Sequence, residues 1–409
     1  MKVVAALALV VAVGAVGVGG VAHAQPRALE RSELDAMIGE QPPQVVLLTF
    51  GVGPRIFEKF GHAALCLEYV ETAREPVCFN YGVTTFDEGA SMIWGFLRSV
   101  QKFWVDPEAW SDMIGFYQDE DRDIYEQVLP LTAEQARMLE REILTSLEEK
   151  HRYYHYDHFF NNCTTRLRDM IDRATAGKLH EGSAVAYPLT FREMGHRGLA
   201  GLPPLIALAD FVLGRQLDDK PSLWQAMFHP DVLRQHVTTA LGVPPRLIYK
   251  RQGEPFPTGG STWRWPMLVI ALVFTLPLVL ALRLRSRTAR IDDTGPTWRR
   301  RFERIALAWA TIYLALWGLI VWGLAIVSSI PGVRWNENLL VLVPLDIVLP
   351  FLGAERRRRY ARVRVAGLFL VSALCGAGVL HQPLWIPILS ALLPLSIIAF
   401  DQKIASARA

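Results

Sequence analysis

Long apolar blocks dominate the second half of the chain and alternate with short polar connections. From residue 265 onward, five such blocks recur, and none shows the polar face that a helix on the surface of a soluble core would keep. Each approaches the roughly 20 residues that a helix needs to cross a bilayer, although the third and fourth are short. The pattern predicts an all-α bundle of five transmembrane helices within residues 266–401, over the segments 266–282, 305–327, 339–352, 365–380 and 383–400.

The basic residues of the connections predict the orientation of these helices. The stretches RLRSRTARIDDTGPTWRRRFER and ERRRRYARVR follow the first and third blocks. The connections after the second and fourth blocks contain a single arginine, Arg334, and no lysine. Since arginine and lysine concentrate in cytoplasmic loops, we expect residues 25–262 outside the cytoplasm and the tail, residues 402–409, inside it. The net charge of +3 is accounted for by these loops and gives no reason to expect a nucleic-acid partner.

The first 24 residues are typical of a secretory signal peptide. One lysine precedes an apolar run, and Ala22 and Ala24 form a small-x-small cleavage pattern ahead of Gln25. A retained membrane anchor is the alternative interpretation, and both export the chain that follows. The signal sequence and the arginine-rich loops therefore agree, independently, on an integral, multi-pass membrane protein with an exported N-terminal domain.

The exported part, residues 25–250, shows the periods of both strands and helices, which predicts an α+β domain. The run PQVVLLTF indicates a buried strand, and GHAALCLEYV and EPVCFNYGV form a predicted hairpin around ETAR. Thr132 and Gln135 have the spacing of a capping box ahead of an amphipathic helix. The stretch CTTRLRDMIDRAT predicts a second helix. A Pro, Gly and Ser-rich linker, residues 251–265, then leads to the apolar blocks.

The four cysteines separate into three kinds. Cys375 lies within a predicted span and is most simply a small apolar residue. Cys66 and Cys78 lie on the two arms of the hairpin and face each other if its turn is centred near Thr72. Cross-strand partners lie at a distance that a disulfide can bridge, and the compartment outside the cytoplasm is oxidising, so we predict a disulfide between them. Cys163 is then the odd thiol of the exported domain.

Cys163 stands directly before a predicted helix. Unpaired N–H groups and the helix dipole favour negative charge there, which lowers a cysteine pKa and makes the reactive thiolate more abundant. The same N–H groups could stabilise the oxyanion of a tetrahedral intermediate. An inert, buried cysteine fits the position as well, so the choice depends on whether a base lies nearby.

His62 is one of several histidines that could be that base, and a hydrogen-bonded structural histidine is the alternative. His62, Ala64 and Cys66 share one face of their strand because strand side chains alternate. A Cys66–Cys78 pair would set Asn80 opposite Ala64, as a diagonal neighbour of His62. An amide beside an imidazole can fix its tautomer, so we predict Cys163, His62 and Asn80 as nucleophile, base and orienting residue.

Four blocks of the exported part, taken together, resemble the Lnb-type N-terminal periplasmic domain, found in bacterial lipoprotein N-acyltransferases. They are LLTFGVGPRIFEKFGHAAL, CFNYGVTTFD, YYHYDHFFNNCTTRLRDMID and VLGRQLDDKPSLWQAMFHPDVL. The resemblance implies a permuted papain-like fold, related to the NlpC group and to lecithin:retinol acyltransferase, in which the histidine strand precedes the cysteine helix. It places the family's Gly-His pair on Gly61 and His62, and its Asn-Cys pair on Asn162 and Cys163.

The implied activity is acyl transfer in the bacterial cytoplasmic (inner) membrane, with the sheet domain in the periplasm. A membrane phospholipid would be the acyl donor, the N-terminal cysteine amine of a diacylated lipoprotein the acceptor, and a Cys163 thioester the intermediate. Two alternatives stay open: a periplasmic cysteine hydrolase (a peptidase or amidase acting on cell-wall peptides), and a non-catalytic envelope scaffold.

The remaining polar candidates near Cys163 have simpler explanations. Asp157 is a weaker rival for the orienting role, or a structural cap. Arg166 and Arg168 could meet a phosphate, but a solvated helix face explains them more simply. The histidines of HRYYHYDHF could ligate a metal, but histidines among aromatic residues usually stack or cap. We therefore predict no metal and no cofactor.

Overall fold

The structure is a computed structural model that describes residues 31–55, 58–72, 74–84, 94–95, 97–98, 100–257, 259, 264–288 and 297–400. The predicted signal peptide and C-terminal tail lie outside the described residues. The chain divides into two compact units. The first contains Met1–Gly201 and Lys220–Gly259, and the second contains Leu202–Asp219 and Gly260–Ala409. We call them the sheet unit and the helical unit.

The sheet unit is built on a seven-stranded antiparallel sheet in the order β6-β4-β3-β2-β1-β5-β7. The central strands are almost completely buried, which agrees with their near-continuous apolar sequences. The strands are β1 (Gln44–Phe50), β2 (His62–Glu68), β3 (Val77–Val83), β4 (Lys102–Ala109), β5 (Ile124–Val128), β6 (Tyr154–His155) and β7 (Arg246–Tyr249).

The hairpin of β2 and β3 has the register that its cysteines predict. Cys66 pairs directly with Cys78, and the two sulfur atoms form a disulfide across the strands. The prediction of this bond is therefore confirmed. Because Leu65 pairs with Phe79, the same register carries Asn80 to the level of Ala64.

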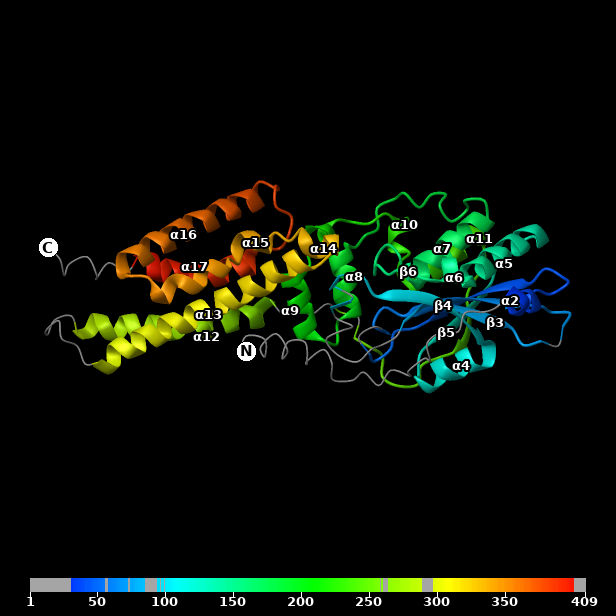
Figure 1. The fold of residues 1–409 in the computed structure, drawn as a ribbon, viewed down its shortest axis with the longest axis horizontal. Coiled ribbons are helices and arrows are strands. Elements are labelled where there is room, and N and C mark those ends of the chain that lie inside the picture. Colours follow the sequence, from blue (N-terminus) through cyan, green and yellow to red (C-terminus); the bar gives the residue numbers. More distant parts are fainter. Residues whose placement is uncertain are drawn as a thin grey trace. The chain divides into compact units, whose positions relative to one another are not determined.

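Helices cover both faces of this sheet (Figure 1). Figure 1 shows α4 (Trp110–Asp119) on one side and α5 (Ala133–Leu147), α7 (Cys163–Ala174) and α11 (Pro230–Leu241) on the other. Met113, Ile114 and Tyr117 of α4 pack with the disulfide and with β1. The unit also contains α2 (Arg31–Met37), α6 (Glu149–Arg152), α8 (Phe191–Gly198) and α10 (Leu223–Ala226).

The predicted capping box of α5 is present. The Thr132 hydroxyl accepts a hydrogen bond from the Gln135 N–H, and the Gln135 side chain accepts one from the Thr132 N–H. These bonds satisfy two of the backbone donors that a helix leaves unpaired at its start. The sequence pattern thus located the first residue of this helix.

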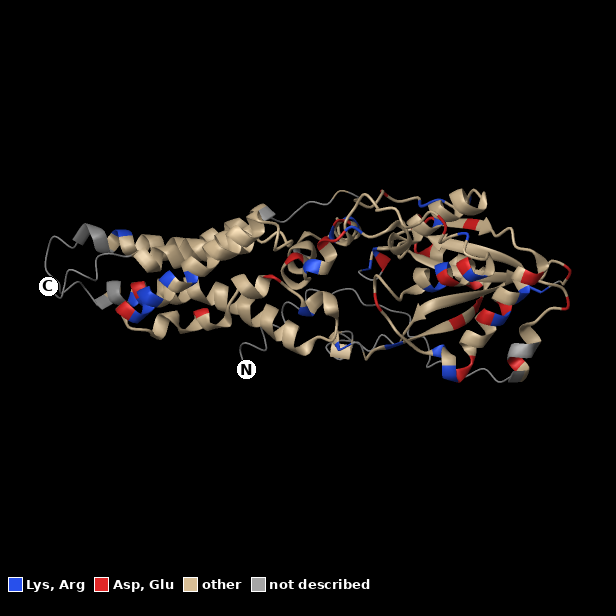
Figure 2. Ribbon diagram, turned by 90° about the horizontal axis from the view of Figure 1, so that it is seen from above, with Lys and Arg blue, Asp and Glu red and all other residues tan. Residues whose placement is uncertain are grey.

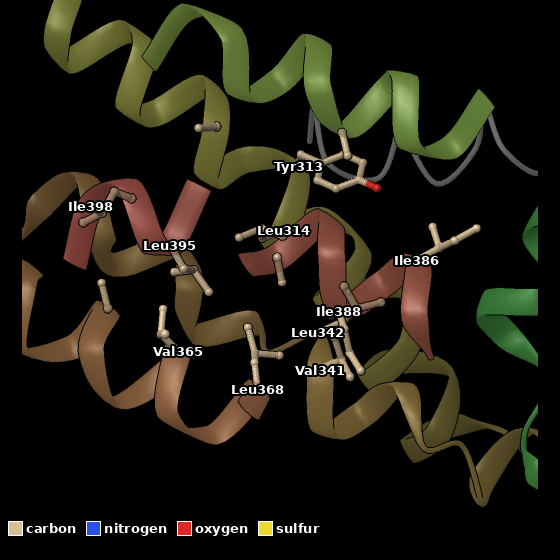
Figure 3. Close-up of a cluster of buried hydrophobic side chains, with 14 of the residues drawn as sticks. Tyr313, Leu314, Val341, Leu342, Val365, Leu368, Ile386, Ile388, Leu395 and Ile398 are labelled. Atoms are coloured by element: carbon tan, nitrogen blue, oxygen red, sulfur yellow. The ribbon is translucent and has the colours of Figure 1, made fainter. Parts of the chain in front are cut away.

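The helical unit forms around one apolar core (Figure 3). Leu314, Leu342, Leu368 and Leu395, which come from separate segments, are fully buried there. The elements are α9 (Pro203–Val212), η2 (Arg215–Asp218), α12 (Arg264–Thr288), α13 (Thr297–Val327), α14 (Pro331–Arg334), α15 (Asn338–Val341), η3 (Pro344–Phe351), α16 (Ala354–Gly376) and α17 (Trp385–Phe400).

The number of membrane spans stays a prediction. Among the described residues, one helical stretch, Arg301–Val327, is long and apolar enough to cross a bilayer by length and composition. Leu268–Leu284 and Trp385–Phe400 are apolar but shorter. The predicted third span, residues 339–352, consists of the short helix α15 and the 3-10 helix η3 instead of one continuous helix. Figure 2 shows the charged residues of the helical unit gathered toward its ends.

The basic stretch after the third apolar block is not a loop but the first half of α16. Its Arg364 binds both carboxylate oxygens of the fully buried Asp346, at 2.9 Å each. The Tyr360 hydroxyl donates a third bond to the same carboxylate, at 2.8 Å. A buried carboxylate needs such partners because isolated burial of its charge is very costly. These bonds explain how Asp346 is tolerated within an apolar block.

Residues 202–219 lie within the predicted exported domain, residues 25–250, but cluster with the helical unit. The Asn336 side chain donates to the carbonyl oxygens of Phe211 and Val212, at 2.8 and 2.9 Å. Gln382 donates to the carbonyl oxygen of Leu213 at 3.0 Å. These bonds satisfy carbonyl groups at the end of α9, which an apolar helix cannot satisfy itself. The fold is thus an antiparallel-sheet domain followed by a helical region, and its relation to permuted papain-like enzymes stays a prediction.

Candidate active site

Cys163 is the first residue of α7, and Asn162 is the residue that caps this helix. The Asn162 side-chain oxygen accepts a hydrogen bond from the Thr165 N–H at 2.8 Å, and the Thr165 hydroxyl accepts one from the Asn162 N–H at 2.8 Å. This capping box fixes where the helix starts. It therefore also fixes the thiol at the positive end of the helix dipole.

Asn162 also links the start of α7 to two other parts of the chain. Its side-chain N–H group donates to the carbonyl oxygens of His158 and Phe228, at 2.9 and 3.0 Å. All hydrogen-bonding groups of this amide are thus engaged, and the side chain is only 4% exposed. The predicted supporting role of Asn162 takes the form of a rigid cap that ties α7 to two loops.

His62 is the first residue of β2, and Gly61 lets the chain turn into this strand. Gly61 has φ +76°, a conformation that favours glycine. A Cβ there would lie 2.7 Å from the carbonyl oxygen of Phe50, which is too close for any other side chain. The Gly-His pair therefore has a local physical reason, because only glycine allows the imidazole to begin the strand at this point.

Asn80 contacts the imidazole as the strand register predicts. The distance between His62 Nε2 and Asn80 Oδ1 is 2.6 Å. An amide oxygen only accepts, so Nε2 carries the proton and Nδ1 is left as the acceptor. The ring of Tyr117 is nearly parallel to the imidazole, with their centroids 6.1 Å apart. Together, the amide and the aromatic ring hold His62 in one tautomer and one orientation.

The surroundings of Cys163 favour its thiolate form. The side chain is 9% exposed, and this burial opposes ionisation. The charge of His62 and its hydrogen bond to the thiol outweigh the burial, helped by the Thr164 hydroxyl and the Ala63 N–H. The net result lowers the pKa of Cys163 from 9.0 to about 7. A substantial fraction of thiolate is therefore present at neutral pH.

The start of α7 also supplies hydrogen-bond donors beside the sulfur atom. The helix cannot satisfy the N–H groups of its own first residues, which here include Cys163 and Thr164. Donors of this kind stabilise negative charge that develops on a carbonyl oxygen when a nucleophile attacks the carbon. The site thus combines an ionisable thiol, an oriented imidazole and donors for an oxyanion.

Asp157 has a structural place outside this set. Its carboxylate accepts hydrogen bonds from the N–H groups of Phe159 and Phe160, at 2.9 and 3.0 Å. It therefore caps the turn that leads to Asn161, with which it forms an isolated bridge. Of the two candidates for orienting His62, the structure brings Asn80 and not Asp157 into contact with the ring.

The other polar candidates are held by aromatic neighbours. The Arg166 guanidinium lies 3.7 Å from the centre of the Tyr154 ring, and that of Arg168 lies 4.0 Å from the Trp224 ring. His158 stacks edge-on against Phe60, and burial, followed by the nearby His229, lowers the pKa of His158 to about 4. In the part of the chain that the structure describes, no group of three or more His, Cys, Asp or Glu side chains could hold a metal ion.

Two residues beside the thiol were missed by the sequence analysis. A Cβ on Gly82 would stand 3.6 Å from the Cβ of Cys163 and 3.9 Å from the hydroxyl of Tyr154. The strand register shifts between Tyr81 and Val83, so an alternating pattern does not reveal what Gly82 faces. Tyr154 belongs to the aromatic stretch before Cys163, where nothing in the pattern singles out one ring.

The fold and the site define a class of protein: an antiparallel-sheet domain followed by a helical region, in which a cysteine at a helix start interacts with a histidine whose ring contacts an asparagine. Within the sheet unit, residues 36–197 match the family model of the Lnb N-terminal periplasmic domain. The matched model describes a domain that stands at the N-terminus and in the periplasm, as the sequence predicts for this part of the chain. No curated protein and no solved structure matches the chain.

Proposed function

We propose that this protein moves a fatty acyl chain from a membrane phospholipid to the N-terminal cysteine amine of a diacylated lipoprotein, through a thioester on Cys163. The observation that carries the proposal is the contact of the Cys163 thiol with His62, which Asn80 orients. A nucleophile, a base and an orienting group in this order are the requirements of covalent acyl transfer.

In the first half-reaction, Nδ1 of His62 accepts the thiol proton and the thiolate attacks the ester carbonyl carbon of the phospholipid. The tetrahedral intermediate collapses with cleavage of the ester C–O bond. The imidazolium returns its proton to the departing oxygen, so a lysophospholipid leaves and a thioester remains on Cys163. The thiol pKa of about 7 supports this step, since the thiolate is available without a strong base.

In the second half-reaction, the lipoprotein amine attacks the thioester carbonyl carbon. His62 accepts a proton from the amine, the C–S bond breaks, and the proton passes to the sulfur atom. The products are an N-acylated lipoprotein and the free thiol, so the cycle needs no cofactor and no redox partner.

Two features support transfer over hydrolysis. Cys163 is only 9% exposed. The phenols of Tyr154 and Tyr156 lie near it: burial raises the pKa of each phenol most, and the charge of the Cys163 thiolate raises it further. A thioester in such a place meets little water. The apolar helices of the second unit suit a reaction whose donor and acceptor both reside in a bilayer, because confinement supplies proximity.

The test replaces Cys163 with serine in cells that depend on this protein. We expect loss of lipoprotein N-acylation, seen by mass spectrometry of N-terminal lipopeptides, while the protein stays folded and in the membrane. Normal lipoproteins with altered cell-wall peptides would contradict the proposal and favour a hydrolase. No change in either would favour a non-catalytic scaffold.

A further inference from the structure

The hydroxyl of Tyr154 is a buried donor that lacks a hydrogen-bond partner among the described residues. Tyr154 is 7% exposed, and its oxygen atom has no measurable contact with solvent. Buried hydroxyl groups in folded proteins are nearly always hydrogen-bonded, because leaving one unsatisfied destabilises the fold. An exception beside a reactive group therefore indicates a partner that arrives only during the reaction.

The space in front of this hydroxyl is shared with the nucleophile. A single point, where a Cβ on Gly82 would stand, lies 3.6 Å from the Cys163 Cβ and 3.9 Å from the Tyr154 oxygen. Both are ordinary van der Waals distances, so the missing side chain of Gly82 leaves room for about one atom between them. Gly82 has φ +95°, which other residues rarely adopt. The backbone thus keeps this space open.

The hydroxyl keeps its proton and is held in place. Burial, and then the charge of the Cys163 thiolate, raise the pKa of Tyr154 well above 10.0, so the group is a donor at neutral pH. The Arg166 guanidinium lies over the phenol ring at 3.7 Å, and Arg166 itself is fixed by a hydrogen bond to Asn161 at 3.1 Å. The nearby phenol of Tyr156 differs, because its oxygen lies 3.5 Å from Nδ1 of His158.

We propose that Tyr154 is a catalytic residue whose hydroxyl donates a hydrogen bond to the oxyanion of the tetrahedral intermediate, in the space beside Gly82. The Cys163 N–H at the start of α7 supplies the second donor. The oxyanion forms in both half-reactions, when the carbonyl C=O bond becomes a C–O⁻ bond, and disappears when that bond reforms. This inference rests on the proposed acyl transfer and adds the donor that stabilises its transition states.

The test compares Tyr154→Phe with wild type in two reactions of the same thiol. Acylation by a phospholipid or an activated ester passes through an oxyanion, whereas alkylation by iodoacetamide displaces iodide and forms none. We expect Tyr154→Phe to slow acylation of Cys163 by about 10²- to 10³-fold, the usual effect of removing one oxyanion donor. Alkylation should stay within about twofold, since the thiol and His62 are unchanged.

Thermal stability gives a second readout. Because the lost hydroxyl has no partner, Tyr154→Phe should melt at the same temperature as wild type or higher. Tyr81→Phe is the matched control, since this buried phenol has a partner of its own, the Ser146 hydroxyl at 2.6 Å. It should lower the melting temperature and leave acylation unchanged.

The outcomes separate this inference from the proposed function. Equal acylation rates in wild type and Tyr154→Phe would overturn the role of Tyr154 while leaving the acyl transfer intact. A parallel loss of acylation and alkylation would also overturn it, because it would show a general disturbance of the thiol. Absence of any acyl adduct in wild type would instead overturn the proposed function.

Discussion

Replacing His62 with alanine should move the titration of the Cys163 thiol upward by about two pKa units. In wild type the pKa is lowered from 9.0 to about 7, although burial is the largest single influence and acts in the opposite direction. The charge and the hydrogen bond of His62 are the main causes of the lowering. Without the imidazole, burial is opposed only by the Thr164 hydroxyl and the Ala63 N–H, so we expect a pKa of about 9 or above.

The size of the effect on reactivity depends on two opposing factors. At pH 7 the thiolate fraction would fall from about one half to about one hundredth, roughly 50-fold. A more basic thiolate is intrinsically more nucleophilic, with a Brønsted coefficient of about 0.4–0.5, which restores about tenfold over two pKa units. The net loss at pH 7 is then about fivefold. The midpoint of the pH profile is therefore a sharper readout than the rate at one pH.

The assay is alkylation by iodoacetamide between about pH 5 and about pH 10, quantified on the Cys163 peptide by mass spectrometry. A Cys375→Ser background removes the other free thiol of the described residues. The rate should rise with pH through the thiol pKa, with its midpoint at about 7 when His62 is present and at about 9 when it is absent.

The matched control is His236→Ala, which removes an imidazole whose Nε2 lies 2.8 Å from the carbonyl oxygen of Leu179. Its alkylation midpoint should stay at about 7, as in wild type. If the midpoint of His62→Ala also stays at about 7, the imidazole is not what stabilises the thiolate, and the site as described here is wrong.

Three further changes test the supports of the site. Replacing both Cys66 and Cys78 with serine opens a loop with a sequence separation of 12 and should cost about 3 kcal/mol, measured as a lower melting temperature without reductant; an unchanged melting temperature would contradict a structural role. Asn80→Ala should slow acylation about 10²-fold, with Asn80→Asp closer to wild type because it keeps an acceptor for Nε2; equal losses in both variants would argue against tautomer control. Gly61→Ala should cost about 1–3 kcal/mol, because its φ of +76° disfavours alanine; wild-type unfolding would refute the strain.

Local patterns predicted the parts of the site that depend on strand register. The disulfide between Cys66 and Cys78 fixes the pairing of β2 and β3, and regular alternation then carries Asn80 to the level of Ala64. The capping pattern located the start of α5, and Cys163 was placed at a helix start. These features follow from short-range geometry, which the sequence displays directly.

Other features depend on irregularities or on distant partners. The register shift after Tyr81 breaks the strand period, so the relation of Gly82 to the thiol and to Tyr154 could not be predicted. The sequence pattern placed Arg364 in a polar loop, but it lies in α16 and binds the buried carboxylate of Asp346, which comes from another segment of the chain. Apolarity alone also did not distinguish one long helix from the short helices of residues 339–352.

The decisive experiment incubates the purified protein with phospholipid vesicles and then adds a synthetic diacylated lipopeptide. Intact-mass and peptide mass spectrometry follow the acyl group at each stage. We expect a fatty-acyl adduct on Cys163 that hydroxylamine removes, that is absent in Cys163→Ala, and that passes to the lipopeptide amine. If N-acylated lipopeptide accumulates while Cys163 never carries an acyl group, or while Cys163→Ala is equally active, the thioester mechanism is contradicted.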